Sequence, residues 1–313
     1  MTGGAARERY WLRPLGLLVV GLALAVGQPF VLMAVPFALL AFLIPGSGVG
    51  GLLLGALALA LVFAGEPGSG FWYLERGWAV LVGGWFVAVS LAWPQRPFFY
   101  RALYAVAGGT LWAGAILLAL GGWASVEWLV EERIRASAVA TMEVVRLISG
   151  QGADQGLTET VMATARAQGV LFPALLGLST LATLGVAWWA HLKVATGSSG
   201  GLGALRNFRF PDPLIWILIV GLSLVVLAGW SAGWGRLGAN MAVFMGGLYA
   251  LRGAAVLLFL TGGISVLTGI VVAVGMILAG PLLLAAAMAV GVGDSWLDLR
   301  ARQARTRSDG MDG

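Results

Sequence analysis

The fold of this chain is decided by the stretch from Asn240 to Thr261, NMAVFMGGLYALRGAAVLLFLT, whose single charged residue is Arg252. A helix needs about 20 consecutive apolar residues to cross the hydrocarbon core of a bilayer, and this stretch has that length. Of the whole chain, 59% of the residues are hydrophobic and 11% are charged, whereas soluble domains carry about 25% charged residues. The stretch therefore predicts a membrane span.

Working outward from this span, we find nine apolar runs. They cover residues 14–28, 30–45, 49–65, 71–93, 98–122, 169–192, 213–231, 238–262 and 265–292. We therefore predict an all-α polytopic membrane protein, a bundle of eight or nine transmembrane helices with an exterior amphipathic helical hairpin. The first three runs are short for a crossing, so one of them is alternatively a re-entrant half-helix.

Basic residues predict how the chain is oriented. The expected parts are a basic N-terminus (1–13), an N-terminal bundle (14–122), an insertion (123–168), a C-terminal bundle (169–299) and an Arg-rich tail (300–313). Basic clusters before the first run, after the fourth and after the sixth fall on one side, which the positive-inside rule makes cytoplasmic. This predicts the bacterial cytoplasmic membrane, with the insertion outside. Nine spans would leave the tail outside, whereas its arginines favour the cytoplasm. Eight crossings are therefore favoured, although no assignment satisfies every cluster.

The insertion is predicted to form two amphipathic helices. Ser125 is the expected N-cap of the first, and an apolar stripe at helical spacing runs from Val126 to Ile148. Thr158 is expected to cap a second helix that ends at Arg166. The hairpin either lies on the outer surface or forms a lid over an outward-opening cavity.

Arg252 is the strongest candidate for a functional residue. An intramembrane arginine costs about 2.5–3.5 kcal/mol on insertion scales and normally faces the bundle interior with a partner. It either binds an anionic ligand group, with Tyr249, Asn240 and Gln28 as further ligand-binding candidates, or pairs structurally within the fold. The candidate partner acids are Asp212, Asp294 and Glu75.

Two further patterns leave alternatives open. Gln28-Pro29 and Gly280-Pro281 interrupt runs in the two halves; such breaks are typical of transport sites, but proline is also common in membrane helices. Small residues recur at helix-packing spacing, and they predict either packing within the bundle or a face for a partner subunit. They are Gly51 and Gly55; Gly246, Ala250 and Ala254; and Gly269 and Ala273.

The residue types present exclude several classes of function. The chain has no cysteine and one histidine, His191, so thiol chemistry is excluded and a zinc site lacks ligands. No nucleophile, base and orienting residue occur together in the spans, so we predict no enzyme, cofactor or metal. The formal net charge of +5 reflects arginines at the ends of runs, where they contact lipid headgroups, so no nucleic-acid partner is expected.

Two motifs carry a resemblance to a known family. Phe-Arg-x-Pro at 208–211 precedes one span, and Gly-x-Gly-Asp-x-Trp-x-Asp-x-Arg at 291–300 closes the last, with Asn240 and Gly246-Gly247-Leu248 between them. The combination resembles the bacterial membrane proteins called domain of unknown function 2232, over most of residues 14–302. The motif positions that it singles out are Arg209, Pro211, Asp294, Trp296, Asp298 and Arg300.

That family is distantly similar to the substrate-binding subunits of energy-coupling-factor vitamin transporters and to the cell-shape membrane protein MreD. The resemblance implies partners in the bilayer, a membrane protein or an ATPase module, but no reaction. In those transporter subunits a small-residue motif on the first helix meets the coupling subunit; here Ala23 and Gly27 match it only loosely. Two functions follow as expectations: binding or transport of a small solute, or alternatively a non-catalytic scaffold for envelope or cell-shape machinery.

Overall fold

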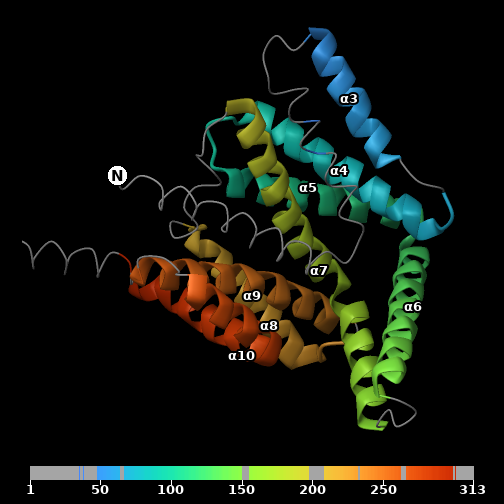
Figure 1. The fold of residues 1–313 in the computed structure, drawn as a ribbon, viewed down its shortest axis with the longest axis vertical. Coiled ribbons are helices and arrows are strands. Elements are labelled where there is room, and N and C mark those ends of the chain that lie inside the picture. The colour runs from blue at the N-terminus through green and yellow to red at the C-terminus, as the bar shows by residue number, and fades with distance from the viewer. Residues whose placement is uncertain are drawn as a thin grey trace, which may run out of the picture. The chain divides into compact units, whose positions relative to one another are not determined.

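The computed structural model describes residues 35, 38, 48–63, 67–149, 155–196, 208–231, 233–261, 266–298 and 300. Every regular element in this part of the chain is a helix. The chain divides into two compact units, residues 1–199 and 200–313; α3 to α7 belong to the first and α8 to α10 to the second (Figure 1). The expected runs 14–28 and 30–45, apart from Val35 and Ala38, lie outside the described residues, as do Gln28 and most of the tail.

The helices of the N-terminal unit match the predicted apolar runs at those ends where the sequence has turn residues. They are α3 (Gly48–Val62), α4 (Gly70–Ala92), α5 (Phe98–Ala119), α6 (Trp123–Ser149) and α7 (Gln155–Thr196). Ser69 caps α4, because its hydroxyl accepts a hydrogen bond from the Trp72 N–H at 3.3 Å. Pro97 stands at the N-cap of α5, where its missing N–H is not needed.

The core of this unit lies between α4, α5 and α7. Its side chains with no exposed surface are Val82, Phe86, Ala102, Ala105 and Leu184. The ring of Phe86 meets the rings of Phe98 and Trp188 edge-on, at centroid distances of 5.8 and 6.1 Å. A polar bond also joins α4 to α7, because the indole N–H of Trp78 donates to the Thr180 hydroxyl at 3.0 Å. Three helices are thus fixed around one aromatic cluster.

The segment expected as a hairpin differs from the prediction. Helix α6 begins at Trp123, so Ser125 lies inside its first turn and is not the cap. Val130, Ala138 and Met142 of the apolar stripe are buried. Helix α7 runs without interruption from Gln155 to Thr196, so the expectation of a separate helix that ends at Arg166 is wrong. The residues around Arg166, ATARAQ, are mostly good helix formers, and a single following glycine does not end such a helix.

The C-terminal unit consists of η2 (Asp212–Leu214), α8 (Ile215–Ala228), α9 (Gly233–Leu260) and α10 (Val266–Leu297). Glycines allow α8 and α9 to pack antiparallel at backbone contact. A Cβ on Gly221 would lie 2.9 Å from the Gly238 carbonyl oxygen, and one on Gly238 would lie 2.6 Å from the Gly221 oxygen. A Cβ on Gly246 would lie 3.3 Å from the Met288 sulfur of α10, so this predicted small residue packs within the unit.

Helix α10 is broken, and its C-terminal part runs parallel to α9. Gly246 faces Met288, Tyr249 faces Gly291 and Arg252 faces Asp294, so both residue numbers rise together. Helices joined by a short connection normally lie antiparallel, so the chain must turn back within α10. Ala279, with φ −140° and ψ 35°, is non-helical and directly precedes Gly280-Pro281. The predicted interruption at Gly280-Pro281 is confirmed.

Five helical segments are long and apolar enough to cross a membrane. They are Gly70–Ala92, Phe98–Ala119, Thr158–Trp189, Gly233–Leu260 and Leu278–Leu297, and Asp212–Ala228 is a shorter apolar segment. Large apolar side chains on the surfaces of these helices are exposed. Leu118 and Val226, for example, are 77% and 84% exposed. Such surfaces suit lipid contact, and the chain has the character of a multi-pass membrane protein. The total of eight or nine spans stays a prediction.

Candidate functional site

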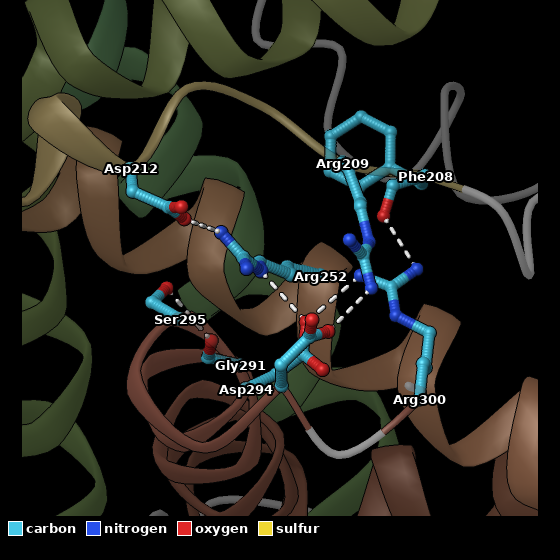
Figure 2. A network of polar contacts seen from close by, with 9 residues as sticks. Phe208, Arg209, Asp212, Arg252, Gly291, Asp294, Ser295 and Arg300 are labelled. Atoms are coloured by element: carbon cyan, nitrogen blue, oxygen red, sulfur yellow. Dashed lines mark hydrogen bonds and ion pairs between the residues drawn. The ribbon is translucent and has the colours of Figure 1, made fainter. Parts of the chain in front are cut away.

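The intramembrane Arg252 lies in the C-terminal unit, where η2 and the end of α10 meet α9 (Figure 2). Its Nε donates to Asp294 Oδ2 at 3.0 Å, and one terminal nitrogen donates to Asp212 Oδ1 at 2.8 Å. The residue is only 3% exposed. Two of the three acids predicted as partners therefore bind it, and the third, Glu75, forms an ion pair with Arg76 at 3.3 Å in the N-terminal unit.

Asp294 is the centre of the network. Its side chain has no exposed surface, and the same Oδ2 that accepts from Arg252 also accepts from Arg300 at 2.8 Å. Arg300 in turn donates from its other terminal nitrogen to the Phe208 carbonyl oxygen at 3.0 Å (Figure 2). One carboxylate therefore holds two guanidinium groups, and its Oδ1 accepts no hydrogen bond from the described residues.

Gly293 and Asp294 both lie within the last helix and do not end it. Helix α10 continues through both residues to Leu297. Gly291 serves helix packing instead, because a Cβ there would collide with the Tyr249 carbonyl oxygen. The close approach of α9 and α10 brings Asp294 to Arg252, which explains why the helix does not stop earlier.

A separate ion pair joins the segment before α8 to the end of α10 at the surface. Arg209 donates to Asp298 at 2.7 Å, and the two side chains are 49% and 55% exposed. Asp298 ends α10 in the left-handed conformation, with φ 42°, which aspartate tolerates better than most residues. Pro211 is the N-cap of η2 and sets the backbone just before Asp212. Trp296, another motif position singled out in the sequence, is 76% exposed.

Among the predicted ligand-binding residues, Tyr249 lies near Arg252 but Asn240 does not. Tyr249 is fully buried, and its ring packs edge-on against Phe210 at 4.9 Å, which also lies 5.4 Å from the guanidinium of Arg252. Asn240 lies about 18 Å further along α9, at ~1.5 Å per residue, and donates to the Arg236 carbonyl oxygen. The structure therefore does not gather these residues into one ligand site.

The ion pairs of this network hold three segments of the chain together. Asp212, Arg252, Asp294 and Arg300 form a chain of alternating acidic and basic groups, so the network is formally neutral. It ties the segment before α8 to α9 and to the end of α10. Removing one partner from a buried pair costs about 3–5 kcal/mol, because the other charge is left uncompensated. The roles of Arg300 and of the Phe208 carbonyl were missed by sequence reasoning, although the motif contained both residues.

No family model matches the chain, and no curated protein or solved structure is significantly similar to it. The resemblance to domain of unknown function 2232 therefore rests on the motif residues alone. Among those residues, Asp294 and Arg300 form one ion pair, and Arg209 and Asp298 form another.

Proposed function

We propose that the chain is a multi-pass protein of the bacterial cytoplasmic membrane whose tail lies on the cytoplasmic side. Support comes from the two contacts that hold the end of α10 beside the segment before α8, namely Arg209 with Asp298 and Arg300 with Phe208. The break at Ala279 and the parallel course of the end of α10 along α9 support a tail on the same side as the basic residues before α8. The positive-inside rule assigns that side to the cytoplasm.

Reporter fusions test this orientation. Reporters after Ser199 and after Gly313 should both be cytoplasmic, and a reporter after Gly152 should be exterior. An exterior reporter at Gly313 together with a cytoplasmic one at Ser199 contradicts the proposed return of the chain.

For activity, we propose a non-catalytic membrane scaffold, an assembly partner for envelope or cell-shape machinery. One observation carries this preference over solute binding: the guanidinium of Arg252 is occupied by Asp212 and Asp294 and is nearly inaccessible. Arg252, the strongest intramembrane candidate for solute contact, is therefore already occupied by ion pairs within the fold. The distant similarity of the resembling family to MreD supports the same reading.

In vivo photo-crosslinking tests the scaffold. A photoreactive residue placed at Leu118 or at Leu227, which is 83% exposed, should form a discrete adduct with one envelope-assembly membrane protein. The buried Ala105 serves as the matched control and should give none. Adducts with lipid alone from both exposed positions contradict the scaffold.

A second function, binding or transport of a small solute, is favoured by the break at Ala279. Interrupted helices line polar routes in many transporters because their freed backbone groups face water. The chain contains no cysteine, so an Ala279→Cys variant offers a single thiol. Labelling of this thiol by a membrane-impermeant maleimide supports the transport function. Protection of the thiol, with labelling of a Trp296→Cys control, supports the scaffold.

A further inference from the structure

The N-terminal unit contains a buried arginine, Arg101, that pairs with no carboxylate in the described part of the chain. Arg101 lies in the first turn of α5 and is 6% exposed. Its guanidinium carbon sits 4.2 Å from the centroid of the Trp188 ring of α7. Its Nε is buried without a hydrogen bond, and no ion pair joins it to any described acid. Among the described residues, the charge is therefore stabilised by the aromatic face of Trp188.

His191 lies one turn beyond Trp188 on the same helix and is also unpaired. It is 5% exposed, and its ring centroid is 5.1 Å from that of Trp188. Its Nδ1 is buried and has no hydrogen-bond partner among the described residues. Burial, and secondarily the nearby charge of Arg101, lower the pKa of this imidazole, so the ring is neutral near pH 7 and carries one N–H donor.

The start of α5 adds a third attraction for an anion. Pro97 stands at the N-cap of α5 and provides no side-chain cap. The positive end of the helix dipole therefore lies beside the Arg101 guanidinium. Phe98 stacks on Trp188 with an interplanar angle of 20°, which fixes the aromatic surface under the arginine.

We propose that Arg101 and His191, held by Trp188, bind the phosphate group of an anionic ligand. A guanidinium fork binds two oxygens of a phosphate, and an imidazole N–H from another helix can reach a third. A planar carboxylate would use the fork and leave the histidine unpaired. The unmet donors therefore match a tetrahedral oxyanion better than a carboxylate.

Two sources supply this chemistry, an anionic phospholipid headgroup and a soluble phosphate compound. The neighbouring Trp93 and Arg96 are exposed, which is typical of residues at the level of lipid headgroups. Basic pockets between transmembrane helices bind anionic lipid headgroups in this zone. The site thus suits a headgroup, and the experiment separates it from soluble phosphate.

The test measures binding to the full chain in phosphatidylcholine nanodiscs. One arm adds phosphatidylglycerol and counts retained lipid by native mass spectrometry; the other adds inorganic phosphate and follows the melting temperature. Arg101→Gln should weaken the binding of phosphatidylglycerol or of inorganic phosphate about tenfold or more, because it removes a charged hydrogen bond. His191→Phe keeps the ring against Trp188 and should weaken binding by a smaller factor. Arg96→Gln, which removes an exposed charge five residues earlier, should bind as the native chain does.

The two arms give distinct outcomes. Loss with Arg101→Gln in the phosphatidylglycerol arm alone assigns a lipid headgroup, and loss in the inorganic phosphate arm assigns a soluble phosphate. Equal binding by Arg101→Gln, Arg96→Gln and the native chain in both arms overturns the proposal. If Arg101→Gln fails to fold, Arg101→Lys replaces it: the ammonium keeps the charge over Trp188 but loses the fork. Native binding by Arg101→Lys and by His191→Phe then also overturns the site.

Discussion

Arg252 and Arg101 are both buried near one end of a membrane helix, yet the two units surround them differently. Arg252 is 3% exposed and is held by two carboxylates, whereas Arg101 is 6% exposed and rests on an indole ring. A guanidinium that already forms ion pairs with acids inside the fold has few donors left to bind a ligand. A guanidinium without such acids retains unused donors. The partners, rather than the burial, therefore distinguish the structural arginine from the binding arginine.

The largest effect is expected from Asp294→Asn. The substitution keeps the shape of the side chain but leaves Arg252 and Arg300 without their shared charge. It should lower the free energy of unfolding by about 3–5 kcal/mol, measured by thermal or denaturant unfolding in detergent with tryptophan fluorescence. Asp298→Asn removes the same charge from an exposed pair and is the matched control. Equal losses for both variants would show that the buried network does not stabilise the unit.

Lysine substitution compares the two arginines directly. Arg252→Lys retains the charge but cannot direct two planar donors at Asp212 and Asp294, so we expect a loss of about 1–3 kcal/mol. Arg101→Lys keeps a cation over Trp188, an interaction worth about 2 kcal/mol when it is desolvated, and should destabilise less. Both losses are measured in the same detergent without added phosphate. A larger loss at Arg101 would contradict the assignment of Arg252 as the structural residue.

His191 gives the N-terminal unit a pH dependence that the Arg252 network does not explain. Its pKa is lowered in the folded state by burial and by Arg101, so the unfolded chain binds the proton more readily. Its contribution to stability is therefore complete above the ordinary histidine pKa of about 6.5 and is lost as the pH falls below it. Melting temperatures between pH 8 and pH 5 measure this slope in the absence of phosphate. The slope should be shallower in His191→Phe, and an unchanged slope would assign the dependence to other groups.

The smallest effect is expected at the exposed ion pair. Arg209→Ala removes the partner of Asp298, and both side chains are about half exposed. Exposed ion pairs contribute about 0.2–1 kcal/mol, so its melting temperature should fall only slightly, and less so at high salt. A loss of stability as large as that of Asp294→Asn would show that the exposed pair stabilises the unit as strongly as the buried network does.

Sequence reasoning predicted those features that depend on composition. Charge is rare within apolar runs, so Arg252 and its partners Asp212 and Asp294 were found, and α4 and α5 follow the predicted runs 71–93 and 98–122 closely. Gly280-Pro281 predicted a break in α10. A proline shows where a helix loses a hydrogen bond but not the direction the chain then takes, so the parallel packing on α9 was not predictable.

Other features depend on contacts between distant residues. Arg101 follows a polar turn and has the sequence position of an ordinary interfacial arginine. Only the packing of α5 against α7 places it on Trp188 and shields it from water. The continuity of α7 was missed because Thr158 and Arg166 suggested local helix ends, while the intervening helix formers favoured continuation.

The carboxylates that pair with Arg252 lie far from it along the chain, and this separation has a consequence during synthesis. Asp212 precedes Arg252 by 40 residues, whereas Asp294 follows it by 42. At ~5–20 residues per second, the ribosome reaches Asp294 roughly 2–8 s after Arg252. During that interval the nascent arginine has only one of its carboxylates, and α9 lacks the helix that shields it. A residue translated later therefore completes the charge balance of a helix made earlier, and until Asp294 is added Arg252 lacks one of its two carboxylates.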